Sequence, residues 1–534
     1  MVIALLSGCT AGLSQSQADK VLTDSQEVLL SLGAEPITLD PAAASGPEAF
    51  AVLANTMEGL LRLGAGGQLL PGVAEEWHVE SSLRYTFRLR KDATWSDGRA
   101  VLAGDFRYAW LRALDPEGAG PHVHQLYHIK GAEALHALDP STDHYHERRQ
   151  QLADQVAIEV LDDHTLRVTL EHPAAHWPQL TAFPTYYPAR ADLVEEFGAR
   201  YGSGYGTAAY NGPFRLVVWN PGDRLVVRRN EHYWDHKAVR LNAVTWLFVA
   251  EPERALAMFQ EGALDRVTVP ESLLPRVKDE GQLLREADPV TWYLVANTRA
   301  PLLGDSRARR ALSQAVDRKE FAAKVLGNAG MPADGLVPPS VAGAHARPQA
   351  SGSREEARQL WQQVLQEAGL ETVHLRLLTP DSPRAMRYAE AVAARLTDLA
   401  GLNPEVVPLS QRDLFQRLAD GDFELAFSGT LAEYNDPMSF LDLWVSGGAL
   451  NDAGWVDNQY DSFIRQALAE PSHEGRQQQM AKAEQRLLEE LPVIPLFHPV
   501  AYHMQQPWLK GVEVHPLGAS PDLTRSYVDG KPRR

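Results

Sequence analysis

The chain has 534 residues, a hydrophobic content of 44% and a formal net charge of −18. Its length predicts about three domains. The acidic balance, which no basic block interrupts, argues against binding to the phosphate backbone of nucleic acids. Phosphate-binding Gly-Lys-Ser loops, Gly-x-Ser-x-Gly elbows and His-Glu-x-x-His motifs are all absent. The sequence therefore carries none of the usual enzyme signatures.

The N-terminal stretch LLSGCT contains Cys9, the single cysteine of the chain. A lone cysteine forms no internal disulfide and no Cys-x-x-Cys metal site. The apolar residues before it resemble the lipobox of bacterial lipoproteins, in which this cysteine is diacylated and becomes the first residue. The resemblance implies a lipid anchor on Cys9, with residues 1–19 as signal remnant and tether. The alternative is a chance cysteine in a disordered N-terminus.

The first half of the chain predicts antiparallel strands with few helices. LRYTFRLR at Leu83–Arg90 alternates apolar and polar residues, which is typical of a half-buried strand. The stretch DFRYAWLRALDP predicts a helix that is capped by Asp105 and ends at Pro116. Residues 157–170 and 214–229 each hold two apolar runs around a turn, so both predict hairpins.

The pattern changes after Asp288. Ser353 and Glu356 form a capping box at the start of an amphipathic helix that Gly369 ends. Strand VHLRLL, a helix from Arg384 to about Ala400, and strand PEVVPL follow, which predicts a strand-helix-strand crossover. A last helix around 476–490 leads into strand VIPLF. This half predicts an α/β domain.

Four stretches carry a resemblance to a known family. They are PGVAEEWHVESSLRYTFRLRKDATWSDGRAVLAGDFRYAW, NGPFRLVVWNPGDRLVVRRNEHYW, NAGMPADGLVPP and AEYNDPMSFLDLW, and the resemblance runs from about Leu39 to Trp508. In this order they resemble the oligopeptide-binding proteins of bacterial ABC importers, the extracellular solute-binding family 5. The resemblance implies an α/β fold of the type II periplasmic-binding-protein kind, with two hinged lobes and an additional mixed lobe.

The resemblance also implies where the lobes begin and end. Lobe I collects residues 20–57, 184–291 and 500–534, and the additional lobe II occupies 58–183. Lobe III, which clasps the ligand, covers 292–499. The hinge is expected near Trp292, Tyr293 and Pro499, close to the change of pattern after Asp288.

In such a receptor a bound peptide joins the protein as an added strand, because main-chain hydrogen bonds ignore side-chain identity. The resemblance implies that Glu433, in LAEYNDP, meets the peptide's α-amino group, where relatives carry an acid that is typically Asp. Its alternative is a solvated surface acid. By the same matching, Gly429, Thr430, Leu431 and Ala432 pair with the ligand backbone from lobe III. Ser45 and Gly46 match the opposing segment of lobe I.

Several positions depart from the family pattern. Where some peptide binders carry arginines for the ligand carboxylate, this chain has Leu418 and Phe427. His122 stands where a pocket tyrosine often lies. A ligand of different length, a modified peptide such as a cell-wall fragment, or a peptide whose carboxylate meets another basic residue would each fit this change. The aromatic side chains Trp292, Tyr293 and Trp444 are candidates for side-chain pockets, with hinge or core packing as the alternative.

The histidine-rich stretches PHVHQLYH and DHYHERR raise the question of a metal site, because His-x-His spacing can bind nickel, copper or zinc. We expect surface loops there, no bound metal and no cofactor. The resemblance predicts a non-enzymatic receptor in the periplasm or on the outer face of the envelope. It is a lipid-anchored monomer that passes peptides to an ABC permease. The alternatives are a receptor for a nickel chelate, haem or another non-peptide solute, and a peptide or murein hydrolase.

Overall fold

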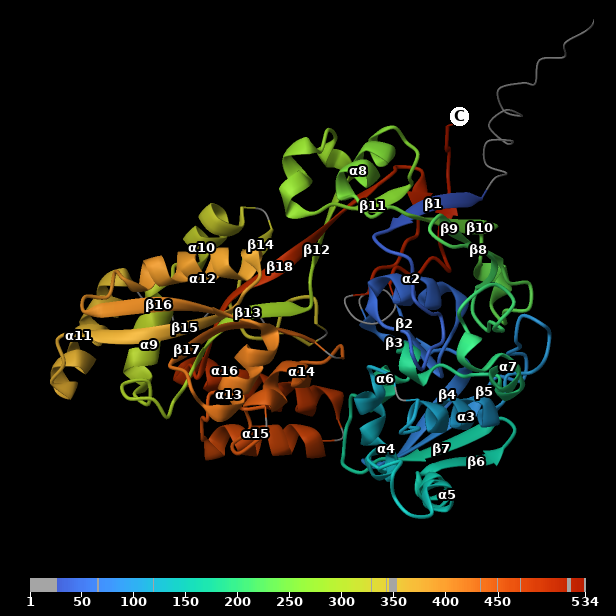
Figure 1. The fold of residues 1–534 in the computed structure, drawn as a ribbon, viewed down its shortest axis with the longest axis horizontal. Coiled ribbons are helices and arrows are strands. Elements are labelled where there is room, and N and C mark those ends of the chain that lie inside the picture. Colours follow the sequence, from blue (N-terminus) through green and yellow to red (C-terminus); the bar gives the residue numbers. More distant parts are fainter. Residues whose placement is uncertain are drawn as a thin grey trace, which may run out of the picture.

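The structure, a computed structural model, divides into two halves with a gap between them (Figure 1). Strands join the halves at one end of the gap, and the halves also touch where Tyr434 of one stacks on His176 of the other. One half holds the C-terminal α/β part, and the other holds the N-terminal sheet with a smaller sheet below it. The ranges that the structure describes are 26–64, 67–118, 120–327, 329–341, 343–344, 353–432, 434–448, 450–470, 472–515 and 520–532.

A single sheet of 12 strands runs through both halves. Its order is β16-β15-β17-β13-β18-β11-β1-β10-β9-β8, with β12 and β14 also paired to β18. The strands are β1 (Glu27–Leu32), β8 (Phe214–Asn220), β9 (Arg224–Arg229), β10 (Ala243–Phe248), β11 (Arg266–Thr268), β12 (Leu283–Ala287), β13 (Val290–Ala296), β14 (Gly330–Pro332), β15 (Val373–Pro380), β16 (Leu402–Leu409), β17 (Leu425–Leu431) and β18 (Val493–Gln505).

Strand β18 joins the two halves. Its first residues pair with β13 in the C-terminal half, and its last residues pair with β11 and β12 in the other. The second crossing is the step from β12 to β13 through Asp288 and Pro289. The amide of Asp288 donates to the carbonyl of Pro499 at 3.0 Å, so the two crossings touch. The partner exchange occurs within a few residues of the expected hinge, while the lobe boundaries themselves stay predictions.

The C-terminal half is an α/β layer in which β15 and β16 pair in parallel and are connected by a crossover helix, α12. Its core packs the sheet against α11 and α12, around buried Trp361 and Leu377. Ser353 and Glu356 form the predicted capping box. The helices are α9 (Ser306–Ala315), α10 (Arg318–Phe321), α11 (Arg354–Ala368), α12 (Pro383–Leu396), α13 (Gln411–Asp420), α14 (Met438–Leu441), α15 (Asn458–Ala469) and α16 (His473–Glu490).

The other half carries a second, antiparallel sheet in the order β4-β5-β7-β6. The sheet packs around buried Phe87, Trp110 and Trp177. Its strands are β4 (Ala74–Ser81), β5 (Arg84–Leu89), β6 (Ile158–Asp162) and β7 (Thr165–Thr169), next to the pair β2 (Leu61–Leu63) and β3 (Leu69–Pro71). The helices of this half are α2 (Gly46–Thr56), α3 (Ala103–Ala113), α4 (Ala132–His136), α5 (Tyr145–Gln155), α6 (Trp177–Leu180), α7 (Ala191–Phe197) and α8 (Pro252–Gln260).

Most predicted elements are confirmed, including both hairpins and the strand-helix-strand crossover. The differences lie at helix ends. The helix predicted to begin at Asp105 starts at Ala103, because Asp105 accepts the amide of Leu102 at 3.0 Å from its third position. The helix predicted to run to about Ala400 ends at Leu396.

A buried carboxyl group, Glu58, fastens the segment between α2 and β2 to the loops that precede β8 and follow β9. Tyr233 Oη and Trp234 Nε1 each donate to a different Glu58 oxygen at 2.6 Å. The amide of Glu58 donates to Asn211 Oδ1 at 3.0 Å. Burial raises the pKa of Glu58 to about 7, against the two hydrogen bonds and the charges of Arg62 and Arg90. The carboxyl group is therefore more acidic in the unfolded chain than in the folded one.

This pKa difference makes Glu58 a source of pH-dependent stability. A folded pKa of about 7, against an ordinary value of 4.5, gives stability that is complete below pH 4.5 and lost as pH rises through 7. Between these limits the free energy of unfolding should fall by about 3 kcal/mol more in the wild type than in Glu58→Gln. Urea unfolding at several pH values in this range measures the difference, and Glu390→Gln at an exposed position is the control. If the free energy of unfolding changed with pH in the same way in the wild type and in Glu58→Gln, the assignment would be contradicted.

Candidate functional site

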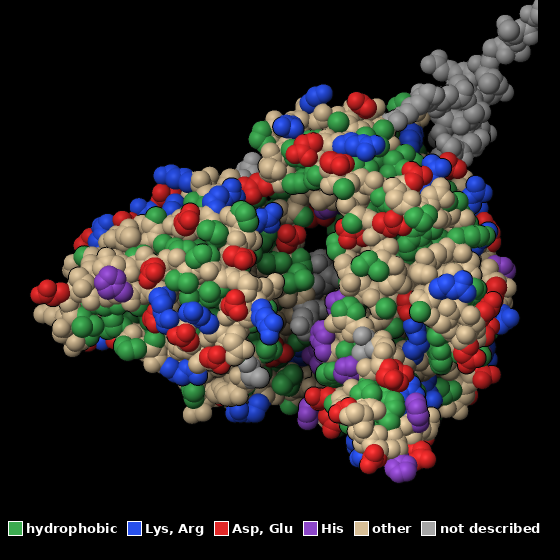
Figure 2. Space-filling view, viewed as in Figure 1, with side chains coloured by type: hydrophobic (Ala, Val, Ile, Leu, Met, Phe, Trp, Pro, Cys, Tyr) green, Lys and Arg blue, Asp and Glu red, His purple; other side chains and the backbone are tan. Residues whose placement is uncertain are grey.

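The gap between the halves contains a cavity of about 830 Å³ at its hinge end. Figure 2 shows the molecule hollowed between the two halves. The wall comes from the end of β1, the first turn of α2, both hinge crossings and a loop of the C-terminal half. Its lining residues include Ser31, Leu32, Gly33, Glu48, Arg266, Thr268, Glu286, Asp288, Pro289, Ser340, His503, His515 and Pro521.

Several charged side chains in this wall form ion pairs with one another. Arg266 contacts Glu286 at 3.0 Å, and His503 Nε2 lies 3.2 Å from the same carboxyl group. Burial opposes ionisation of Glu286, but the hydrogen bond from His503 and the charges of His503 and Arg266 outweigh it and lower its pKa. Burial raises the pKa of Asp288. With Glu48, the wall carries three carboxyl groups against one arginine and two histidines. Arg266 and His503 both contact Glu286, so Glu48 and Asp288 are the two carboxyl groups that favour a cationic group in the cavity.

Strand β17 ends beside this cavity with one edge open. Strand β13 pairs with it along its whole length, whereas β15 pairs only with Leu425 and Ala426. Within the described residues, the opposite edge of Phe427–Leu431 therefore carries no strand. The side chain of Leu431 is exposed there. The amide of Ala432 donates at 2.8 Å to the carbonyl of Pro289, which lines the cavity.

The end of β1 in the other half is similar. Strand β10 pairs with all six residues of β1, whereas β11 pairs only at Leu30. The β11 side of Ser31 and Leu32 is thus unpaired within the described ranges, and both residues line the cavity with Gly33. An unpaired strand edge is a template for another extended segment. Each half therefore offers one such edge near the cavity.

A match to a family model is consistent with this arrangement. The model of bacterial extracellular solute-binding proteins, family 5 Middle, matches residues 68–452, well over half of the chain. The chain belongs to this family.

Named relatives of this family-5 protein cover nearly its whole length. The dipeptide-binding protein DppE of Bacillus subtilis is 30% identical, over 96% of this chain and 95% of the relative. The periplasmic oligopeptide-binding protein OppA of Escherichia coli is also 30% identical, over 96% and 94%.

Solved structures of the family confirm the predicted fold class of hinged α/β lobes. The unliganded open form of the murein tripeptide-binding protein MppA matches with a TM-score of 0.86 at 28% identity, over 95% of this chain and 98% of that one. A second structure, of the Escherichia coli murein tripeptide-binding protein MppA, matches with a TM-score of 0.70 at 28% identity and covers 95% of this chain and 99% of that one. OppA of Listeria monocytogenes bound to peptide scores 0.66 at 25% identity, over 95% and 99%.

The AEYNDP motif of this family-5 protein is held at several points. Glu433 itself lies outside the described residues, as does Cys9. Tyr434 stacks on His176 of the smaller-sheet part with ring centroids 3.9 Å apart. Asp436 is buried against Arg476, with Nη2 2.8 Å from Oδ1, and also accepts the amide of Met438. Asp436 of the motif therefore has a structural role, because it binds Arg476 and caps the first amide of α14.

The predicted aromatic residues lie mainly in the core. Trp444 is 2% exposed and Tyr293 5% exposed, and their rings pack edge to face. The hydroxyl group of Tyr293, in β13, contacts that of Thr430, in β17, so the tyrosine stabilises β17 from the neighbouring strand. Trp292 stacks between Phe427 and Phe497. Their assignment to ligand pockets stays a prediction.

The predicted residues of the other half lie at the start of α2. Ser45 is its exposed N-cap, and Gly46 begins the helix with φ of +83°. Neither lines the cavity, whereas Ser31, Leu32 and Gly33 do. His122 is half-buried against Phe50, which belongs to α2, so it lies near this helix. The pairing role of Ser45 and Gly46 stays a prediction.

Leu418 and Phe427, the positions where some relatives carry arginines, are buried in the cores of the C-terminal half. Sequence reasoning missed Arg266, Glu286 and His503. Their side chains come together from β11, β12 and β18, which are far apart in the chain. No local pattern marks them, although Asp288 follows directly after the strand that holds Glu286.

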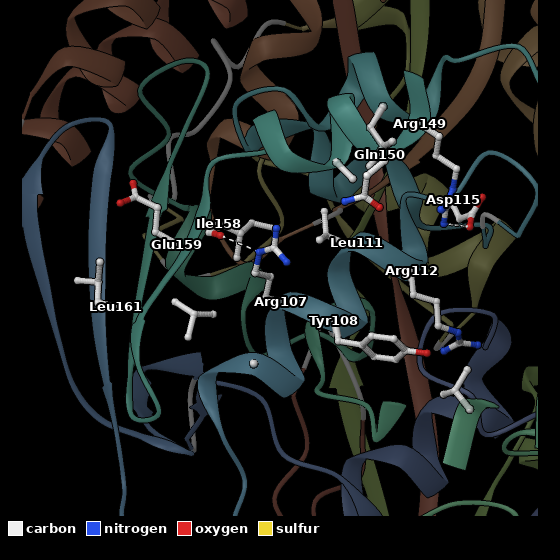
Figure 3. A pocket seen from close by; sticks show the side chains of 15 residues that line it. Arg107, Tyr108, Leu111, Arg112, Asp115, Arg149, Gln150, Ile158, Glu159 and Leu161 are labelled. Atoms are coloured by element: carbon white, nitrogen blue, oxygen red, sulfur yellow. Dashed lines mark hydrogen bonds and ion pairs between the residues drawn. The ribbon is translucent and has the colours of Figure 1, made fainter. Parts of the chain in front are cut away.

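A second cavity, of about 940 Å³, lies outside the gap, on the face of α3 (Figure 3). Its arginines are already engaged. Arg107 donates to the carbonyl of Ile158 at 3.2 Å, Arg112 pairs with Asp40, and Arg149 pairs with Asp115. It therefore offers a ligand fewer uncommitted charges than the cavity at the hinge.

Proposed function

We propose that the protein is an extracytoplasmic receptor that captures peptides between its two halves and delivers them to an ABC transporter permease. The observation that carries the proposal is the pair of unpaired strand edges, at β17 and at the end of β1, beside one cavity. The relatives named as dipeptide- and oligopeptide-binding proteins support the ligand class.

An extended peptide would join either edge through main-chain hydrogen bonds. Peptide N–H and C=O groups recur at fixed spacing in every sequence, so such pairing accepts many peptides. The exposed side chain of Leu431 offers apolar contact to alternate ligand side chains. Side-chain preference would then come from the pockets between the halves.

The ligand's charged amino group is the second part of the proposal. We assign it to Glu433, with support from the carboxyl-rich cavity wall of Glu48, Glu286 and Asp288. A buried ammonium group needs a carboxylate partner, and loss of one partner of such a pair costs on the order of 2 to 5 kcal/mol.

A hydrolase is a weaker candidate. Two described hydroxyl–imidazole pairs lie at or near the cavity. Thr268 Oγ1 lies 3.2 Å from His503 Nδ1 in the wall itself, where the other ring nitrogen of His503 contacts Glu286, but no nucleophile motif surrounds Thr268 in the sequence. Thr291 Oγ1 lies 2.9 Å from His498 Nδ1. Thr291 is fully buried and donates its proton to the carbonyl of Leu336 at 2.7 Å. This hydroxyl group is a hinge contact and is closed to substrate. Family-5 solute-binding proteins are transport receptors, and we extend that role without catalysis to this chain.

A lipid anchor on Cys9 would hold the receptor beside its permease as a monomer. No helix within the described ranges is both long and apolar enough to cross a membrane. We expect the intact mass of the mature protein to include a diacylglyceryl group, which Cys9→Ala loses. An unmodified mass for the wild type in its native host would contradict the anchor.

The role of Glu433 predicts a selective loss of affinity. Glu433→Ala should weaken free-amine peptides by about 30-fold or more, as expected from a lost charge partner. N-acetylated versions of the same peptides should lose little. Titration calorimetry measures both, with exposed Glu390→Ala in α12 as matched control. Equal losses for the two peptide types would contradict the assignment.

Closure around the ligand predicts a change of shape. The higher TM-score to an unliganded open form than to a peptide-bound relative supports an open state here. Only a ligand that contacts both halves stabilises a closed state. Small-angle scattering should therefore give a smaller radius of gyration with saturating peptide, and no change with free amino acids. An unchanged radius at calorimetrically proven saturation would contradict closure.

A further inference from the structure

We propose that Glu513, His515 and Asp522 form a binding site for a divalent transition-metal ion of the zinc class. The three residues lie beside the hinge cavity on the C-terminal ribbon, the two antiparallel segments that pair at Glu513 and Asp522. One donor atom from each of the three residues lies within 4.8 Å of the other two. An imidazole nitrogen with two carboxylate oxygens is a donor set that suits Zn²⁺.

The backbone explains why the three side chains converge. Glu513 and Asp522 face each other across an antiparallel bridge, in which their amides and carbonyls exchange hydrogen bonds of 3.0 and 2.8 Å. Directly opposite residues in such a pair project to the same face. His515 lies two residues beyond Glu513, the spacing that returns to this face in an extended segment.

The second observation is the state of His515 itself. It is 7% exposed, and its Nδ1 has no hydrogen-bond partner within the described structure. A buried polar atom without a partner is costly in a folded protein. A metal ion held by the ring and the two carboxylates is one partner that would remove this cost.

Charge also favours an added cation. Two carboxylates directly opposite each other on a bridge repel. Oδ1 of Asp522 accepts the amide of Thr524 at 2.7 Å, so we assign the other oxygen, Oδ2, to the ion. Arg62 lines the same small cavity of about 40 Å³ with His515 and Asp522 and offsets part of the negative charge. That volume is large enough for an ion or water beside the side chains.

The position gives the ion a structural role. His515 and Pro521 line the larger cavity at the hinge. Asn55 of α2 donates to the carbonyl of Pro521 and accepts the amide of Leu523, each at 2.8 Å. A bound ion would fasten the two arms of the ribbon to each other, and with Asn55 would fix this wall of the cavity against α2.

Zinc titration of chelator-stripped, full-length receptor tests the proposal. The wild type should bind one Zn²⁺ tightly and melt at higher temperature with Zn²⁺ present. His515→Ala and Glu513→Gln should each weaken this binding by at least the roughly 10- to 100-fold seen for loss of an outer partner, and both should lose the melting shift. The control is the double variant His144→Ala, His146→Ala, which removes two exposed histidines from another surface. It should bind one Zn²⁺ as tightly as the wild type does.

Circular dichroism and the metal-free melting temperature establish that each variant is folded. Glu513→Gln keeps the test valid should His515→Ala fail to fold, because Glu513 is less buried than His515. Wild-type affinity for Zn²⁺ in Glu513→Gln, or loss of tight binding in the His144, His146 variant instead, would overturn the proposal. So would an absence of tight binding to the wild type.

Discussion

Backbone pairing along β18 is the constraint on which the whole arrangement depends. This strand bonds to β13 in one half and to β11 and β12 in the other, so one ladder of hydrogen bonds spans the join. The second crossing, at Asp288 and Pro289, is bonded to it through the carbonyl of Pro499. Bending at these two crossings would change the relative angle of the halves while the sheet on either side stays intact, and it would also shift the Tyr434–His176 stack that links the halves away from the crossings. The cavity lies at this join, so bending there would alter its width.

The open edges of β1 and β17 follow from the same sheet. Strand β11 pairs with β1 only at Leu30, and β15 pairs with β17 only at Leu425 and Ala426, so within the described residues the backbone polar groups beyond these points have no strand partner on that side. Water can satisfy such groups while the halves are apart, but closure would remove water from both faces. An extended ligand can replace it on each side. Empty closure is then costly and filled closure is favourable, which gives a transporter a signal to read.

Local patterns predicted the elements well, because hairpins and capping boxes are encoded within about 15 residues, as at Ser353 and Glu356. Helix ends were less accurate where a side chain acts from inside the first turn, as Asp105 does. The site was harder to predict, since Arg266 and His503 meet only after the strands pair. The motif around 433 was found by resemblance, but its Asp436 proved to serve Arg476, forty residues away.

The ligand carboxylate remains the point where chemistry must differ from that of some relatives. Positions 418 and 427 hold Leu and Phe that are buried in the cores, so a clamp there would require burying a charge without a partner. In the hinge cavity, Arg266 already pairs with Glu286 and is shared with Gln505 at 2.9 Å. A carboxylate that approached it would compete with these partners. On the proposed binding mode, the wall would favour the positive end of a peptide over its negative end. A ligand carboxylate without a fixed clamp would then allow ligands of different length.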